Sequence, residues 1–263
     1  MISVLQLGTI DYATGLRLQE KLVELRKEGR IGDVLLLLEH CPVITLGRNA
    51  KATNIIASPE SLAQHGVELF ETNRGGDATF HGPGQIVGYP IFDLRGFPSS
   101  SGKRPTMGAI EYVRGLEEVL IRTCADFAIP TKRIPGLTGV WTDPQDTKVE
   151  EAKIAALGVH ISRAVTSHGF ALNVNTDLSF FNLIIPCGIT NKQVTSMQRQ
   201  LGRQLDLNSI AESLSRNMGR VFSSQILWVE SLDDLLGFKV GVPMQVPGEL
   251  REMHRQKDDI ALA

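Results

Sequence analysis

The chain has 263 residues, of which 42% are hydrophobic and 21% charged, and its formal net charge is −2. This is the composition of a globular protein long enough to bury a substantial core, and it creates no overall field that attracts nucleic acid or anionic membranes. No apolar run reaches about 18 residues, so we expect no membrane-spanning helix.

The three cysteines of the chain, Cys41, Cys124 and Cys187, are far apart and show no CxxC spacing. This pattern argues against a disulfide framework and against a structural zinc site. The N-terminal segment lacks a basic start and reaches Asp11 too soon for a signal peptide. We therefore expect a cytoplasmic protein without a metal site.

The first part of the chain shows clear periodicity. Apolar residues recur at helical spacing over 11–28, and a continuous apolar run over 33–39 is typical of a strand buried on both faces. Ser58 and Pro59 are typical of the N-cap and first position of a short helix. The strands predicted for this part of the chain are 4–7, 33–39, 43–46 and 67–71.

Further along, segment 106–127 has the apolar face of a long amphipathic helix, and because Cys124 lies on that face we expect it to be a core residue. Segment 97–105 is rich in proline, glycine and serine and is typical of a surface loop. Toward the C-terminus the periodicity weakens, with a strand or loop expected at 237–247 and a solvated charged stretch at 251–259. The remaining predicted elements are strands at 153–162 and 168–175, joined by a link over 163–167, and a helix at 208–222. This irregular order favours an α/β or α+β fold over a doubly wound series.

The most informative segment is 74–90, which contains five glycines and two prolines and leads into an apolar stretch. It has neither the GxxxxGK[ST] pattern of a P-loop nor the GxGxxG pattern of a dinucleotide site. A tight turn between strands would explain one glycine pair. The grouping of Arg74, Thr79 and His81 in the same segment instead favours a ligand site.

A second feature is Cys187, which lies between a proline and a glycine and so is expected at a sharp bend. A thiol with an ordinary pKa of ~8.5 is only slightly ionised at neutral pH, and a nearby ammonium group increases the thiolate fraction. Lys153 is the candidate partner, because it stands in an otherwise apolar strand, although a strand-edge lysine that reaches solvent has the same pattern. His81 or His168 could serve as the base instead.

These segments resemble the lipoyl(octanoyl) transferases, a family of acyltransferases. The match covers residues 1 to about 220. Two positions depart from the family pattern: Cys41 stands where proline is more usual, and Asp77 where glutamine is common. The five matching stretches, in order, are 42–48, 74–85, 153–159, 168–174 and 186–189.

The resemblance implies a single domain with a mixed β-sheet packed against helices, like the catalytic domains of biotin and lipoate protein ligases. It implies transfer of an octanoyl group from octanoyl-acyl carrier protein to a lysine of lipoyl domains, the first step of endogenous protein lipoylation. Cys187 is expected to form an acyl-thioester intermediate, and Lys153 to tune the pKa of its thiol. No ATP, metal or other cofactor is expected, since the substrate arrives on the phosphopantetheine arm of the carrier.

The resemblance also implies three substrate-binding segments. They are Arg74, Gly75, Gly76, Asp77, Ala78, Thr79, Phe80 and His81, then Ala156, Leu157 and Gly158, then Gly169, Phe170 and Ala171. We further expect an apolar slot for the acyl chain and a local basic patch for acidic protein partners. The slot is expected from Phe80, Leu157, Val159 and Phe170, and the patch from Arg48, Lys51, Arg74, Lys132, Arg133 and Arg163.

The expected acceptors are apo lipoyl domains of 2-oxoacid dehydrogenase complexes and the H protein of glycine cleavage, and the expected oligomeric state is a monomer. The expected domains are a catalytic domain over 1–227 and a C-terminal extension over 228–263. An ATP-dependent lipoate protein ligase on the same fold is the nearest alternative. A non-catalytic acyl- or carrier-binding module and a cysteine hydrolase are more distant ones.

Overall fold

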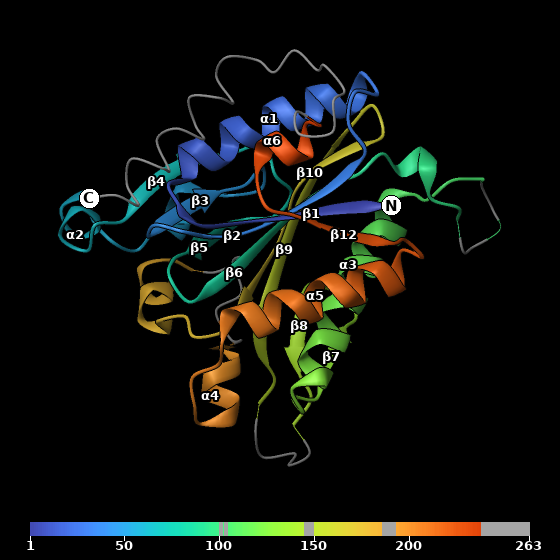
Figure 1. Ribbon diagram of the computed structural model, residues 1–263. Coiled ribbons are helices and arrows are strands. Elements are labelled where there is room, and N and C mark those ends of the chain that lie inside the picture. The colour runs from blue at the N-terminus through green and yellow to red at the C-terminus, as the bar shows by residue number, and fades with distance from the viewer. Residues whose placement is uncertain (100–101, 103–104, 145–149, 186–192, 238–263) are drawn as a thin grey trace.

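Two β-sheets and the helices around them form the molecule in the computed structural model, which describes residues 1–99, 102, 105–144, 150–185 and 193–237 (Figure 1). The larger sheet is mixed, because β1 pairs in parallel with its neighbours β12 and β2, whereas the ladders from β2 through β7 are antiparallel. Its strands, in spatial order, are β12 (Ile226–Val229), β1 (Ile2–Ile10), β2 (Asp33–His40), β6 (Gln85–Ile91), β10 (Val165–Asn173), β9 (Ala152–Ser162), β8 (Leu137–Thr142) and β7 (Thr131–Ile134), with β11 (Gln193–Val194) paired to β9.

The smaller sheet has the order β4 (Glu68–Glu71), β3 (Val43–Leu46) and β5 (Ala78–His81). Helix α1 (Tyr12–Lys27) lies over one face of the larger sheet, and α3 (Ala109–Asp126) and α5 (Leu207–Val221) lie over the other, as Figure 1 shows. The shorter helices are α2 (Pro59–Gln64), α4 (Met197–Leu201) and α6 (Leu232–Leu235), and the 3-10 turns are η1 (Ala52–Asn54), η2 (Leu94–Gly96) and η3 (Leu178–Leu183).

Each face of the larger sheet has its own apolar core. One core joins the sheet to α3 and α5, and the second joins it to α1. A third, smaller core fills the space between the smaller sheet, α2 and η3. The single-domain arrangement of a mixed sheet packed against helices is the one that the sequence predicts.

The predicted helix starts agree with the observed caps. Asp11 caps α1 by accepting a hydrogen bond from the Thr14 amide at 2.8 Å, and Ser58 caps α2 ahead of Pro59. Cys124 is fully buried on α3, and burial raises the pKa of its thiol to about 12, so it is the core residue that the pattern indicated. Helix α3 begins three residues later than predicted, at Ala109, because Gly108 takes an extended backbone conformation and serves as the N-cap.

Two other expectations need correction. The link predicted over 163–167 is only Arg163–Ala164, and both residues have positive φ, as in a two-residue hairpin turn. Segment 97–105 is not simply a surface loop, because Phe97 is buried against Phe92 and Phe222. The segment of weak periodicity near the C-terminus contains β12 and α6, and each is too short to show a repeating apolar pattern.

Strand β12 pairs with β1 and ends at Val229, so the larger sheet continues past residue 227. The division into 1–227 and 228–263 stays a prediction, since 238–263 lie outside the described residues, as do most of 237–247 and all of 251–259. None of the helices in the described part of the chain has the length and apolar character needed to cross a membrane.

Candidate active site

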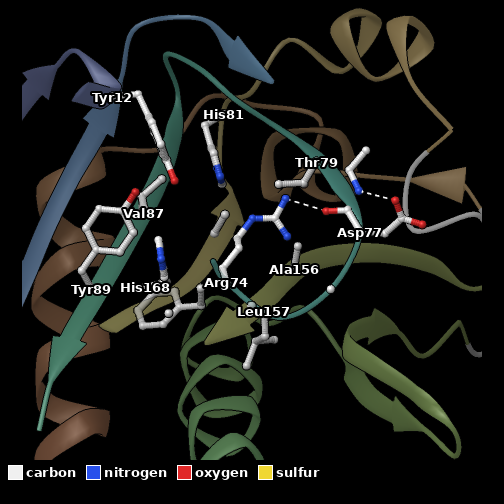
Figure 2. Close-up of a pocket in the computed structure, with 16 residues that line it drawn as sticks. Tyr12, Arg74, Asp77, Thr79, His81, Val87, Tyr89, Ala156, Leu157 and His168 are labelled. Atoms are coloured by element: carbon white, nitrogen blue, oxygen red, sulfur yellow. Dashed lines mark hydrogen bonds between the residues drawn. The ribbon is translucent and has the colours of Figure 1, made fainter. Parts of the chain in front are cut away.

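A cavity lies between the two sheets, where the loop before β5 crosses the middle of β9, next to β10 (Figure 2). The larger sheet supplies its floor from β6, β9 and β10, and the smaller sheet supplies a wall from β5 and the preceding loop. Its lining residues are Tyr12, Arg74, Gly76, Asp77, Ala78, Thr79, His81, Val87, Tyr89, Ala156, Leu157, Gly158, His168, Gly169, Phe170 and Ala171. Three of the expected motifs, far apart in the sequence, therefore meet around one space.

Arg74 holds the wall of this cavity together. Its guanidinium is buried and donates hydrogen bonds to the carbonyl and hydroxyl oxygens of Thr45 at 2.6 and 2.9 Å, and to the carbonyl oxygen of Asp77 at 2.6 Å. These bonds tie the loop over 74–77 to β3. In Figure 2 the guanidinium lies centrally among the lining residues, so it is a structural part of the wall and not an exposed cation.

The same loop is also tied to η1. Asn54 donates to both carboxylate oxygens of Asp77 at 2.7 Å, and Asp77 accepts a further bond from the Ala78 amide at 2.6 Å. The carbonyl oxygen of Asn54 accepts from the Ile185 amide at 2.7 Å. Asp77, the departure from the family pattern, thus links the cavity wall to the last described residue before segment 186–192.

Close backbone approach explains two of the glycines. The Gly75 amide donates to the Val159 carbonyl at 2.9 Å, which places the loop directly on β9. A Cβ on Gly158 would lie 2.6 Å from the Gly75 carbonyl oxygen, a distance that real side chains do not reach. Gly76 has a φ of 89°, which favours glycine. These positions keep the loop against the sheet and shape the cavity.

His81 faces the cavity as a neutral ring. Its Nδ1 lies 2.7 Å from Oε1 of Gln85, whose amide nitrogen donates to Phe80 and Asn173, so Oε1 accepts and Nδ1 carries the proton. Burial, followed by the nearby His40 ring, lowers the pKa of His81 to about 3. Its Nε2 therefore presents a lone pair.

Tyr12 and Tyr89 line one end of the cavity, and the ring of His40, outside the lining, packs against both of them. Nδ1 of His40 donates to the Ile10 carbonyl at 3.1 Å, so its Nε2 accepts from the Tyr89 hydroxyl at 2.7 Å. Burial lowers the pKa of His40 to about 4, raises that of Tyr12 to about 12 and raises that of Tyr89 well above its ordinary value. This end is polar and uncharged near neutral pH.

His168 lies on β10 at the same end. It has a positive φ of 54°, its amide donates to Gln19 Oε1 at 2.8 Å, and its Nε2 lies 2.7 Å from Asn73 Oδ1. Its Nδ1 is buried and has no hydrogen-bond partner among the described residues. Burial, followed by the charge of Arg74, lowers the pKa of His168 to about 3.

Lys153 is buried on β9, three residues before Ala156, and its ammonium lies 4.8 Å from the centroid of the Trp141 ring. Its expected partner Cys187 lies outside the described residues, which resume with Gln193. Val194 pairs with Lys153 in β11, and the Thr195 amide donates to the Lys153 carbonyl at 2.9 Å. The chain therefore leaves toward Cys187 beside Asn54 and returns beside Lys153.

Two residues expected to bind substrate are not among the cavity lining. Phe80 points to the opposite side of β5 from Thr79 and His81, where its ring stacks on Phe180 at 4.7 Å. Gly75 contacts Val159 through its backbone, and Val159 itself is also absent from the lining. The other twelve expected residues of the three segments line the cavity. The lining has four further members, which are Tyr12, Val87, Tyr89 and His168.

Those four residues were missing from the expected binding set. Val87 and Tyr89 alternate along β6 directly after the glycine-rich loop, so period-two alternation was a signal for them. Tyr12 follows the N-cap of α1 and comes from a distant part of the chain, which no local pattern reveals. His168 lies beside Gly169, so the glycine-containing segment is the sequence signal for it.

The expected basic patch is not formed as a whole. Arg74 is buried, Lys132 pairs with Asp143 and Glu151 at 2.9 and 3.2 Å, and Arg133 pairs with two glutamates of α3. The exposed members are Arg48, Lys51 and Arg163. Within the described residues, no group of three or more His, Cys, Asp or Glu side chains is arranged to hold a metal ion.

The sequence matches the family described as lipoyl protein ligase A/B catalytic domain over residues 11–219. The octanoyltransferase of Koribacter versatilis (strain Ellin345) is 60% identical over 264 aligned positions, which cover 100% of both chains. The octanoyltransferase of Acidobacterium capsulatum is 58% identical over 238 residues, which cover 90% of this chain and 96% of the relative.

Solved structures with the same fold include a bi-partite lipoate protein ligase from Thermoplasma acidophilum. It has a TM-score of 0.67 at 15% identity and covers 98% of this chain and 91% of that one. A lipoate-protein ligase A bound with ATP has a TM-score of 0.66 at 14% identity, covering 98% and 95%. At such identities the likeness establishes the fold, and it confirms the prediction of a lipoate-ligase-like catalytic domain.

Proposed function

The chain belongs to the lipoyl protein ligase A/B catalytic-domain family, and from this premise we propose that it transfers octanoyl groups from octanoyl-acyl carrier protein to lysines of lipoyl domains. The predicted activity agrees with the names of the relatives, and the chain is an acyltransferase of protein lipoylation. The carrier-bound donor, the covalent route and the residue roles below are parts of the proposal.

The observation that carries the proposal is the meeting of three separate segments around one cavity, with Lys153 close by on β9. A β-bulge decides where Lys153 points. Ile154 and Ala155 both pack into the core with α3 and α5, so Lys153 and Ala156 both project to the opposite side, and Ala156 lines the cavity. Lys153 is therefore on the cavity side of the sheet.

In the first proposed step, the Cys187 thiolate attacks the carbonyl carbon of the octanoyl thioester. A new sulfur–carbon bond forms, the bond to the phosphopantetheine sulfur breaks, and the carrier leaves as a thiol. One thioester replaces another, so the step needs no ATP. The ammonium of Lys153 favours the thiolate form of Cys187 by its charge.

In the second step, the amine of an acceptor lysine attacks the acyl-enzyme. A carbon–nitrogen bond forms, the bond to Cys187 breaks, and the amide leaves with the acceptor. The attacking nitrogen must lose a proton, which passes to the departing thiolate, and Lys153 serves as the relay. No metal or redox cofactor enters this balance.

The acyl chain is proposed to occupy the cavity, with its methylenes against the apolar side chains of Val87, Ala156 and Ala171. Burial of one methylene contributes about 0.8 kcal/mol, so six give roughly 5 kcal/mol, enough to select against short chains. The backbone of the loop over 74–77 closes the other side.

The proposed acceptors are lipoyl domains, including those of 2-oxoacid dehydrogenase complexes and the H protein of glycine cleavage. The exposed side chains of Arg48, Lys51 and Arg163 are available to acidic partners. The proposed working form is a cytoplasmic monomer that uses neither ATP nor a metal.

A transfer assay tests the proposal. The protein is mixed with octanoyl-acyl carrier protein and an apo lipoyl domain, without ATP, and the acceptor is analysed by mass. We expect octanoylated acceptor with the wild type and none with Cys187→Ser. Modification only when ATP and free octanoate are supplied would instead identify an ATP-dependent ligase. Release of free octanoate without acceptor would identify a hydrolase.

A further inference from the structure

The indole ring of Trp141 lies beside the ammonium group of Lys153. We propose that Trp141 is a positioning residue that holds the Lys153 ammonium group in its working place, an inference that rests on the catalytic role given to Lys153 above.

The backbone sets the direction of both side chains. Val140 pairs with Ala155, but the next residue of β8, Trp141, pairs with Lys153, so Ile154 is an extra residue in β9. Val140, Ile154 and Ala155 all lie in the core with α3 and α5, whereas Trp141 does not. The bulge thus turns Lys153 to the same side as Trp141.

The methylene groups of the Lys153 side chain pass over the backbone of Gly139, which has no side chain to displace them. A Cβ on Gly139 would be 3.3 Å from Cε and 3.6 Å from Cδ of Lys153, so any side chain there would press on these methylene groups. Gly139 has a φ of 131° and its amide donates to Glu117 Oε1 at 3.1 Å. Glu117 is fully buried on α3 and pairs with Arg114 at 2.6 Å. The surface under the lysine is therefore fixed to α3.

The ammonium lies over the face of the indole, with Nζ 4.8 Å from the ring centroid. Trp141 is 1% exposed and Lys153 is 8% exposed, so water screens this contact little. The indole N–H has no hydrogen-bond partner among the described residues, so hydrogen bonding does not account for a tryptophan at this position. Trp141 therefore contacts the Lys153 ammonium through the electron-rich face of its ring.

The test compares Trp141→Leu with Trp141→Phe in steady-state octanoyl transfer. Because only Trp141→Leu removes the ring face, we expect its kcat to fall about tenfold with little change in KM for the octanoyl carrier, and Trp141→Phe to recover most of the loss. Trp228→Phe, at the exposed tryptophan of β12, is the matched control and is expected to retain the wild-type kcat.

A double-mutant comparison separates this role from simple packing. In a Lys153→Met background, Trp141→Leu is expected to cause no further loss, because the group that it positions is already absent. An equal loss in both backgrounds, or equally low kcat for Trp141→Leu and Trp141→Phe, would overturn the proposal. Full activity of Lys153→Met would instead contradict the proposed function itself.

A spectroscopic measurement covers the case in which Trp141→Leu does not fold. The chain has two tryptophans, so Trp228→Phe leaves Trp141 as the single indole fluorophore. A protonated amine in contact with indole quenches its emission, so Lys153→Met in that background is expected to increase the emission. Unchanged emission would show that ammonium and ring are not in contact in solution.

Discussion

At the scale of single residues, three buried histidines in and beside the cavity stay neutral near neutral pH. His40, His81 and His168 have folded-state pKa values of about 4, 3 and 3, because burial disfavours their charged forms. These values lie below the ordinary value of 6.5, so unfolding takes up protons below that pH. The free energy of unfolding therefore falls as the pH decreases below 6.5, and it is fully retained above it.

One substitution isolates this effect. His168→Asn removes one of the three histidines, and asparagine tolerates the positive φ at this position. Between pH 7 and pH 5, a buried neutral histidine loses about 2 kcal/mol of stability, so the acid-induced loss in the variant should be smaller by that amount. Urea unfolding at the two pH values measures it. The exposed His65→Asn variant is the control, and an unchanged acid-induced loss in His168→Asn would contradict the account.

A second residue prediction concerns chain length. Ala171 is buried on β10 and lines the cavity, so Ala171→Val fills space that the acyl chain would occupy. Two displaced methylenes correspond to about a tenfold shift of kcat/KM from octanoyl toward hexanoyl carriers. Ala125→Val, on the exposed side of α3, is expected to leave the ratio unchanged. The same ratio in both variants would remove Ala171 from the acyl site.

At the scale of elements, the local sequence predicts where a helix starts better than it predicts which side of a sheet a side chain points to. The caps at Asp11 and Ser58 are visible in the sequence because one side chain and its neighbouring amides decide them. The side of the sheet to which Phe80 points depends on the pairing of β5 with β3, which is a long-range contact. The bulge at Ile154 likewise depends on the partner strand β8, and no period within β9 reveals it.

The hairpin between β9 and β10 gives an element-scale prediction. Arg163 and Ala164 both occupy the left-handed region, with φ of 52° and 67°, where asparagine and glycine are favoured. The double change Arg163→Asn and Ala164→Gly is expected to raise the free energy of unfolding by about 1 kcal/mol. Ala63→Gly in α2 is the control and should lower it by roughly 0.5–1 kcal/mol. Chemical unfolding measures both, and a loss in the hairpin variant would contradict the turn geometry.

At the scale of the whole molecule, the sheets make a site from segments that no local pattern connects. Loop 74–77 lies against β9, β10 completes the floor, and Tyr12 comes from α1. The motifs and their order predict which segments participate, and the topology decides which of their side chains reach the cavity. The polar end formed by Tyr12, Tyr89 and His168 is a product of the fold, since these three residues come from three separate elements.

In the proposed reaction, an octanoyl group passes through a covalent enzyme intermediate on Cys187. The most direct measurement is the intact mass of the protein after mixing with octanoyl-acyl carrier protein, without ATP and without acceptor. We expect a gain of one octanoyl group that hydroxylamine removes and that Cys187→Ser lacks. An unchanged mass, with lipoyl-domain modification appearing only after ATP and free octanoate are added, would contradict the proposed reaction.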